Sequence, residues 1–174
     1  MQRHQLEHII RASAAITGAD RFVIVGSQAI LGQFPNAPAD LLRSIEADLF
    51  SLRDPADSDL IDGSIGEGSP FHQTFGYYAH GVSSDTAVLP EGWADRLVAV
   101  RNANTGEGSG LCLEIYDLAV SKLVAGREKD LDFVAGLFRH GLVSAETIRE
   151  RLSAVKVDEP RRQLTLARLS RLGP

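Results

Sequence analysis

The order of hydrophobic patterns along the 174-residue chain predicts an α/β or α+β fold with a helical C-terminus. Helical and strand patterns alternate at the start, strand signals are concentrated in the middle, and the pattern from Asp117 onward is helical. Such an order favours a sheet covered by helices and followed by further helices.

The first elements are a helix, a buried strand and two short helices. Apolar residues in "QLEHIIRASAAI" recur at nearly helical spacing until Gly18, which is expected to end the helix. The apolar, β-branched run "RFVIVGS" is typical of a buried strand. "QAILGQF" and "LLRS" then predict short helices on either side of the loop "PNAPAD".

The stretch "RSIEADLF", residues 43–50, predicts the second strand. Side chains alternate between the faces of a strand, so Ile45, Ala47 and Leu49 share one face. Glu46 and Asp48 share the other. These acids are either a carboxylate pair for a metal ion or the solvent face of a half-buried strand, and their spacing alone leaves both readings open.

The middle of the chain is rich in strand signals. Residues 54–70 predict loop and helix, because Gly and Pro interrupt them repeatedly. "FGYYAHGVSSDTAVL" offers aromatic and β-branched residues for a strand. "RLVAVRN" and "LCLEIY" predict two neighbouring strands joined by the turn "NTGEGSG".

The remaining chain predicts helices. Asp117 is expected to N-cap "LAVSKLVAG", and Gly126 is expected to end it. "EKDLDFVAGLFRHG" follows with its apolar residues on one face, "SAETIRERLSAV" begins at a Ser cap, and "EPRRQLTLARLSRLG" supplies the last helix. We predict a main domain over residues 1–140 and a helical extension over 141–174 that packs on it.

Composition excludes several classes of protein. Hydrophobic residues make up 44% of the chain and charged residues 24%, which is typical of a soluble globular domain. No apolar run approaches the roughly 18 residues of a membrane span, and the first residues do not resemble a signal peptide. The single Cys112 excludes an internal disulfide and a multi-cysteine zinc site. We therefore expect a cytoplasmic protein that does not bind a membrane.

The net charge of −5 conceals an uneven distribution. Residues 1–148 hold 11 Lys and Arg against 20 Asp and Glu, whereas residues 149–174 hold 7 against 3. The acids crowd between Asp40 and Glu67 and could attract a divalent cation. The basic end could meet phosphates or an acidic partner, or it could be a solvated amphipathic helix.

Two further features carry possible chemistry. Gly26 and Ser27 end a buried strand just before a helix, where backbone amides and the Ser27 hydroxyl could receive a phosphate. Lys122 lies in an otherwise apolar helix, so its amine is expected at the edge of a cleft, where it could bind phosphate. Asp130 could orient that lysine or assist deprotonation, and Arg127 lies between them in sequence. Ordinary surface salt bridges are the alternative.

These segments together resemble the nucleotidyltransferase superfamily, and most closely its small bacterial members of the abortive-infection and toxin–antitoxin type. The residues that carry the resemblance, over roughly residues 20–140, are Gly26-Ser27, Glu46-Ala47-Asp48, Lys122, and Arg127 with Lys129-Asp130. The resemblance implies a mixed central sheet flanked by helices, with Mg²⁺ held by Glu46 and Asp48. It also implies a nucleoside triphosphate bound by Gly26, Ser27, Lys122 and Arg127, and assigns catalysis to Glu46, Asp48, Lys122 and Asp130.

The implied reaction transfers a nucleotide to a tRNA or a protein, and an antitoxin is a possible partner. The sequence departs from the family where Glu46 replaces the usual first Asp, and no third strand carboxylate is evident, Glu114 being the best candidate. These departures favour an alternative, a catalytically inactive member that binds a nucleotide or a partner. Tyr78 and His80 could contact a base or an acceptor, while His72 and His80 are interpreted as surface or structural residues rather than zinc ligands.

Overall fold

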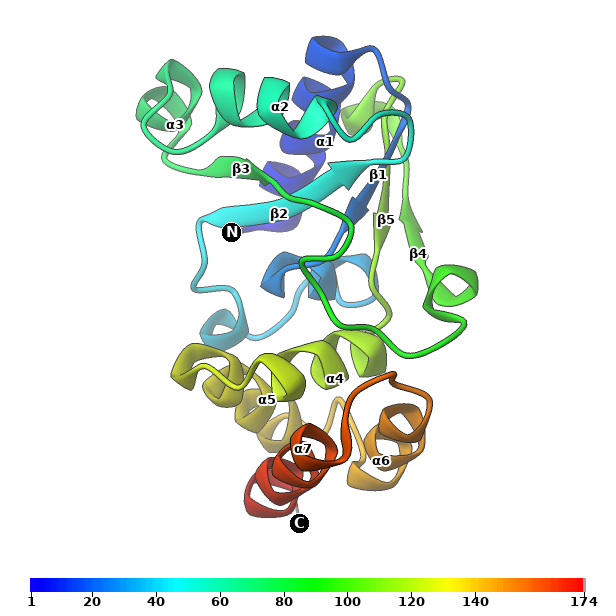
Figure 1. Ribbon diagram of the computed structural model, residues 1–174. Coiled ribbons are helices and arrows are strands. Elements are labelled where there is room, and N and C mark those ends of the chain that lie inside the picture. Colours follow the sequence, from blue (N-terminus) through cyan, green and yellow to red (C-terminus); the bar gives the residue numbers. More distant parts are fainter. Residues whose placement is uncertain (174) are drawn as a thin grey trace.

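A five-stranded mixed sheet forms the centre of the computed structural model, which describes residues 1–173 (Figure 1). The strands are β1 (Arg21–Ile24), β2 (Glu46–Ser51), β3 (Tyr78–Gly81), β4 (Val98–Val100) and β5 (Ser109–Cys112). Their order across the sheet is β3-β2-β1-β5-β4. The β1/β2 and β4/β5 pairs are antiparallel, and the β1/β5 and β2/β3 pairs are parallel. The α/β class, the mixed sheet and the β4/β5 pair are thereby confirmed.

The helices form two groups (Figure 1). The α-helices are α1 (Arg3–Thr17), α2 (Asp57–Ile65), α3 (Pro70–Phe75), α4 (Ile115–Ala125), α5 (Glu128–Arg139), α6 (Ala145–Ser153) and α7 (Glu159–Leu172). Short 3₁₀ helices are η1 (Ser27–Gly32), η2 (Ala39–Leu41), η3 (Trp93–Arg96) and η4 (Ala103–Thr105). Helices α1 and α2 contact each other and the sheet, whereas α4, α5, α6 and α7 pack mainly on one another. The two short helices predicted near residues 27 and 41 are 3₁₀ helices.

The core lies where α1 meets the middle of the sheet. Phe22, Val23 and Ile24 of β1 are completely buried, as expected for a central strand covered on both faces. Helix α1 comes close to β5 because Gly110 has no side chain: a Cβ there would lie 2.5 Å from Cδ1 of Ile10. Gly18 ends α1 in the left-handed conformation, as predicted.

The predicted N-cap of α4 is wrong. The helix begins two residues before Asp117, and Glu114 caps it by accepting a hydrogen bond from the backbone N–H of Tyr116 at 3.1 Å. Asp117 is instead fully buried and accepts hydrogen bonds from Nε and Nη2 of Arg96 at 2.8 and 3.0 Å. The strand predicted over "LCLEIY" ends early, at Cys112, because Glu114 two residues later caps a helix.

The strand predicted over "FGYYAHGVSSDTAVL" is also shorter than expected, since only Tyr78–Gly81 pairs in the sheet. The chain then crosses to the C-terminal helices. Pro90 forms an isolated β-bridge with Val155, and the N–H of Glu91 donates to the carbonyl of Ala154 at 2.9 Å. Residues 82–97 thus connect the two halves of the molecule.

The C-terminal helices pack closely with the helices before them. Ser144 caps α6 by accepting from Thr147 N–H, as predicted, and Asp158 caps α7. Arg168 of α7 donates to the carbonyl of Leu123 in α4 at 2.8 Å. The division at residue 140 stays a prediction. In the described part of the chain, no helix combines the length and the apolar character needed to cross a membrane.

Strand β3 is an edge strand, and α2 covers its open side. The N–H of Gly81 donates to Asp62 Oδ1 at 2.8 Å, and the Ser58 hydroxyl donates to the carbonyl of Val82 at 2.9 Å. Gly81 also allows close packing, because a Cβ there would lie 2.2 Å from the carbonyl oxygen of Ser58. Helix α2 therefore satisfies backbone groups that an edge strand leaves open and fixes the position of β3.

Replacing Gly81 with Ala should separate α2 from β3. Because the new methyl group would overlap the backbone of Ser58, we expect the free energy of unfolding to fall by about 1–3 kcal/mol. Urea unfolding measures the change. Gly63→Ala is the control: Gly63 lies in α2 with no atom near its Cβ position, so this substitution should stabilise the protein by about 0.5–1 kcal/mol. Equal stabilities for the two variants would contradict the packing described here.

Candidate active site

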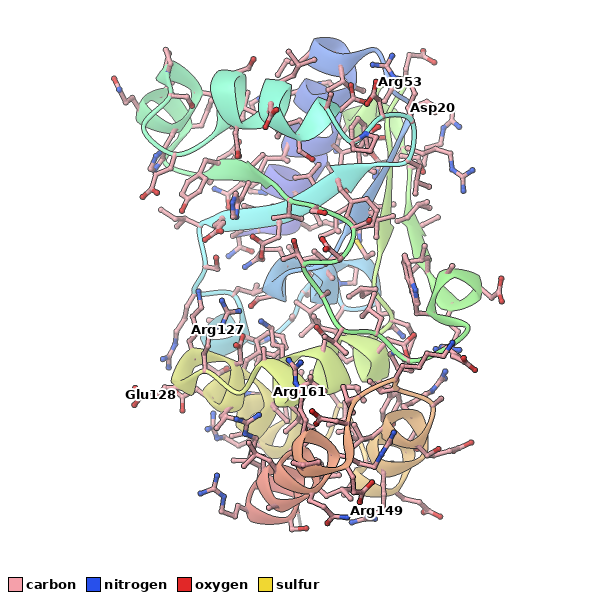
Figure 2. All side chains as sticks on the ribbon, viewed as in Figure 1. Asp20, Arg53, Arg127, Glu128, Arg149 and Arg161 are labelled. Atoms are coloured by element: carbon pink, nitrogen blue, oxygen red, sulfur yellow. The ribbon has the colours of Figure 1, made fainter. Side chains whose placement is uncertain are left out.

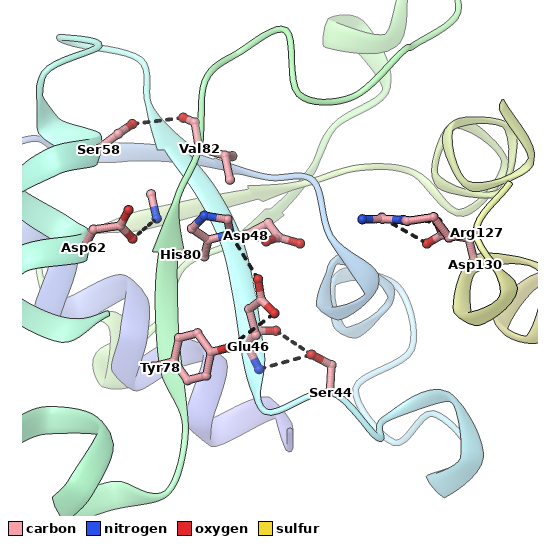
Figure 3. Close-up of polar contacts among 11 residues, drawn as sticks. Ser44, Glu46, Asp48, Ser58, Asp62, Tyr78, His80, Val82, Arg127 and Asp130 are labelled. Atoms are coloured by element: carbon pink, nitrogen blue, oxygen red, sulfur yellow. Dashed lines mark hydrogen bonds and ion pairs between the residues drawn. The ribbon is translucent and has the colours of Figure 1, made fainter. Parts of the chain in front are cut away.

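The pairing of β2 with β3 brings four polar side chains to one face of the sheet (Figure 3). The strands run parallel, with Glu46 paired to Tyr78 and Asp48 paired to His80. Ala47 and Leu49 on β2 are completely buried on the other face, as the alternation of the sequence predicts. The face that carries the acids is only partly open to solvent, because the Glu46 and Asp48 side chains are 29% and 30% exposed.

His80 links the two carboxylates. Its Nδ1 lies 3.0 Å from Glu46 Oε1 and 3.1 Å from Asp48 Oδ1, and the Tyr78 hydroxyl donates to Glu46 Oε2 at 3.4 Å. One ligand atom from each of Glu46, Asp48 and His80 lies within 4.8 Å of the others. The acids are therefore a clustered pair with a third potential ligand, rather than an isolated solvent face.

The electrostatics of this cluster favour a cation. Partial burial and the neighbouring Asp48 raise the pKa of Glu46 above its usual value, although His80 opposes the shift. Burial alone would lower the pKa of His80, but the hydrogen bond to Asp48 and the surrounding carboxylates outweigh it and raise the pKa. Neighbouring carboxylates contribute to both pKa shifts, and a divalent cation would offset their negative charge.

Gly26 lies against this cluster. A Cβ at that position would fall 2.1 Å from Oδ2 of Asp48, so any other residue would displace the carboxylate. The backbone of Gly26 has an extended conformation with negative φ, which every residue can adopt. Close approach, and not an unusual turn, is thus the reason for glycine. Ser27 begins η1 and lines the cleft beside the acids.

A second charged group faces the acids across the cleft (Figure 3). Lys122 of α4 donates to Asp130 Oδ1 at 2.9 Å, and Arg127 donates from Nε to Asp130 Oδ2 at 2.6 Å. The Lys122 ammonium also lies 5.3 Å from the centre of the Phe133 ring. The Lys122 side chain is 10% exposed and that of Arg127 is 64% exposed. Arg127 is therefore the more accessible of the two cations.

One cleft of about 730 Å³ between the sheet and α5 is lined by Ser27, the two acids of β2, Lys122 and Arg127, whereas Gly26 and Asp130 do not line it. Its cationic residues come from the loop before β2 and from the C-terminal helices: Arg43, Lys122, Arg127, Lys129 and Arg139. Its carboxylates are the β2 pair on the strands, with Asp40 and Asp132 on the helix side, where Asp40 forms an ion pair with Arg139 at 2.8 Å. The strand wall is therefore acidic, and on the helix side the cations outnumber the acids. The size suits a small-molecule ligand, and the divided charge suits a polyphosphate bound through a metal ion.

A family model described as "Nucleotidyltransferase of unknown function (DUF6036)" matches residues 4–166. The chain belongs to this family. No curated protein and no solved structure was found to match the chain.

The match to the nucleotidyltransferase family confirms the family-level resemblance inferred from the sequence. It spans every residue assigned to the candidate site and continues beyond residue 140 into α7. The family description names no substrate. The roles of the individual residues therefore rest on their geometry.

The geometry distinguishes the two roles considered for Asp130. Its side chain is fully buried, and both of its oxygens accept hydrogen bonds from Lys122 and Arg127. Burial alone would raise the pKa of Asp130, but these two cations outweigh it and hold the pKa below its usual value. This arrangement fits a residue that positions two cations and does not fit a proton acceptor in the cleft.

Glu114, considered as a third acid, lies elsewhere. It caps α4 and is not among the residues that line the cleft. His80 of β3 stands beside the carboxylate pair instead. The sequence suggests His80 as a contact for a base or an acceptor, or as a surface or structural residue, and does not place it beside the acids. The signal that could have identified it is the alternation of Tyr78 and His80 with the buried Tyr77 and Ala79, which repeats the pattern of β2.

Replacing Asp130 with Ala should destabilise the protein, because it leaves the Lys122 ammonium largely buried without its counter-ion. We expect a loss of about 3 kcal/mol in the free energy of unfolding at pH 7. Urea unfolding tests this expectation. Asp132→Ala, at an exposed position on the same helix, is the control and should change stability by less than about 0.5 kcal/mol.

The stabilisation by Asp130 should also depend on pH. Its native pKa is lowered from 3.8, so the unfolded chain takes up the proton first as the pH falls. The stabilisation is complete above the unfolded pKa and is lost as the pH falls through the native value. The difference in unfolding free energy between wild type and Asp130→Ala should stay constant from pH 7 to about 5 and then shrink. A difference that persists undiminished to about pH 2 would contradict this assignment.

Proposed function

We propose that this protein is a Mg²⁺-dependent nucleotidyltransferase that transfers a nucleotide from a nucleoside triphosphate to an RNA or protein acceptor. One observation supports the proposal: the carboxylates of Glu46 and Asp48 face Arg127 across a single cleft (Figure 3), and Lys122 lines the same cleft. Membership of the nucleotidyltransferase family supports it. Cys112 is a buried free thiol. A cytoplasmic location would suit an enzyme that consumes nucleoside triphosphates.

The residues of the cleft divide the work of such a reaction. Glu46 and Asp48 offer the hard oxygen ligands that Mg²⁺ requires. Held by these two carboxylates, Mg²⁺ would supply positive charge that stabilises the charge developing at the α-phosphate. Arg127 can hydrogen-bond to phosphate oxygens through its exposed guanidinium, with Lys122 as a second cation and the Ser27 hydroxyl as a donor. The acceptor oxygen forms a bond to the α-phosphorus and the bond from that phosphorus to the bridging oxygen of the β-phosphate breaks. Pyrophosphate leaves, and the hydroxyl proton passes to water.

The distribution of basic residues favours a polyanionic acceptor such as tRNA. Lys129 and Arg139 line the cleft from α5, and Arg43 lines it from the loop before β2. Figure 2 shows Arg149 and Arg161 on the C-terminal helices, in the same half of the molecule as Arg127. These basic residues at the cleft and on α6 and α7 would give this half of the molecule a surface that attracts a nucleic acid backbone. A toxin that modifies tRNA, held inactive by an acidic antitoxin, is consistent with this surface.

The alternative is a nucleotidyltransferase-fold protein without catalysis that binds a nucleotide or a partner. The observation that favours it is the composition of the acidic wall, where Glu46 replaces the usual Asp and His80 bonds to both carboxylates. A longer side chain at the first position changes the geometry available to an octahedral ion. Substitution of Glu46 separates this alternative from the active enzyme.

Removing the charge of Asp48 should abolish nucleotide transfer. Purified protein is incubated with each labelled nucleoside triphosphate, Mg²⁺ and either total tRNA or total protein. Wild type should transfer label, and Asp48→Asn should lower the rate at least 100-fold, because it loses a metal ligand. Asp59→Asn, at an exposed position on α2, should match wild type. Failure of wild type to label any acceptor, or full activity in Asp48→Asn, would refute the transferase.

Shortening Glu46 to Asp tests whether glutamate at this position is compatible with chemistry. If the glutamate is a working ligand, Glu46→Asp should retain transfer within about tenfold of wild type, and Glu46→Gln should lose it. Calorimetry with nucleotide and Mg²⁺ provides the second measurement. Tight nucleotide binding with no transfer by wild type, combined with a gain of transfer in Glu46→Asp, would support the inactive alternative.

A further inference from the structure

The cluster beside Gly26 contains a nitrogen ligand in addition to its two acids. Nδ1 of His80 lies 3.0 Å from Glu46 Oε1 and 3.1 Å from Asp48 Oδ1, so the nitrogen faces both carboxylates at once. Imidazole nitrogen is a common ligand of first-row transition metals, whereas Mg²⁺ strongly prefers oxygen ligands and water. The donor set therefore differs from an all-oxygen magnesium site.

The distances fit neighbouring positions around one octahedral ion. Metal–ligand bonds of about 2.1 Å place adjacent octahedral ligands about 3.0 Å apart, because the edge is √2 times the bond length. The two measured separations from His80 Nδ1 match this edge. The same nitrogen, carrying a proton, can instead be shared as a donor between the carboxylates. A cation would thus take the place of a proton without rearrangement of the strands.

The position of His80 is built into the fold. The β2/β3 register places it directly beside Asp48, and the next residue, Gly81, is fixed to α2 through its hydrogen bond with Asp62. Asp62 and Glu67 also line a hollow of about 420 Å³ on which His80 borders. The additional acids increase the attraction of this region for a cation.

We propose that His80 is a third protein ligand of the metal site, and that the site consequently prefers Mn²⁺ over Mg²⁺. Mn²⁺ shares the octahedral geometry and the affinity for carboxylate oxygens that Mg²⁺ shows, and as a first-row transition metal it accepts an imidazole nitrogen more readily than Mg²⁺ does. This inference rests on the assignment of Glu46 and Asp48 as metal ligands in the proposed function. It specifies which cation the same cleft selects.

Binding of Mn²⁺ to the metal-free full-length protein, without nucleotide, tests the inference. Electron paramagnetic resonance counts free Mn²⁺ during a titration, and competition with Mg²⁺ gives the preference. Wild type should bind Mn²⁺ at least about tenfold more tightly than Mg²⁺. His80→Ala should lose at least about tenfold in Mn²⁺ affinity and little in Mg²⁺ affinity. His80→Asp, which makes all three protein ligands oxygen donors, should shift the metal preference toward Mg²⁺. His4→Ala, which removes an exposed histidine on α1, is the control and should behave as wild type.

A spectroscopic measurement on wild type gives an answer that does not depend on any variant folding. Electron spin-echo envelope modulation of bound Mn²⁺ should show coupling to a ¹⁴N nucleus. Absence of Mn²⁺ binding, absence of that coupling, or unchanged Mn²⁺ affinity in a folded His80→Ala would overturn the inference. The test is independent of turnover: nitrogen-coupled Mn²⁺ without nucleotide transfer would uphold the site and refute the transferase. Nucleotide transfer by a protein whose bound Mn²⁺ shows no coupling to ¹⁴N would uphold the transferase and refute the proposed site.

Discussion

The close approach of Gly26 to Asp48 is the constraint on which the rest of the cleft depends. The backbone N–H of Val25 donates to the carbonyl of Asp48 at 3.0 Å, so the end of β1 lies against β2 with no room for a side chain. The chain then continues directly into η1. The residue after η1, Gln33, accepts a hydrogen bond through its side-chain Oε1 from the first backbone N–H of α4, that of Ile115, at 2.6 Å. Because α4 carries Lys122, the turn at Gly26 that leaves room for Asp48 also helps to position the opposing cation.

The two walls of the cleft carry opposite net charges, and the residues of each wall do not neutralise the charge of that wall. On the helices, one buried carboxylate, Asp130, binds two cations and leaves one unit of positive charge near the cleft. On the strands, Glu46 and Asp48 share His80 as their polar neighbour, and partial burial together with the neighbouring Asp48 raises the pKa of Glu46. A ligand that combines a divalent cation with a polyphosphate satisfies both walls, since its positive part meets the strands and its negative part meets the helices.

Much of this arrangement could be predicted because it depends on local patterns. Alternation in β2 placed Glu46 and Asp48 on one face, and the glycine at 126 divided two helices so that Lys122 and Asp130 could meet across the break. Predictions failed where a residue type could serve either of two structural roles. Asp117 was suited to cap a helix, yet the preceding Glu114 took that role, and Asp117 became a buried partner of Arg96. Neither the close contact with Arg96 nor the 3₁₀ form of η1 follows from residue spacing, because both depend on tertiary packing.

Alternation along β3 indicates that Tyr78 and His80 share one face, but it does not show which residue of β2 lies beside His80. Strands β2 and β3 are parallel, so α2 and α3 must cross between them, and the length of that crossover does not fix the register. A shift by one residue would have turned Tyr77 and Ala79 toward the acids and buried His80. Helix α2 favours the observed register, because the Ser58 carbonyl leaves no room for a side chain at Gly81 and Asp62 accepts the Gly81 N–H. The acid pair on β2 thus acquires its third neighbour from a helix that contributes no ligand, and this packing makes the polar faces of two strands into one site.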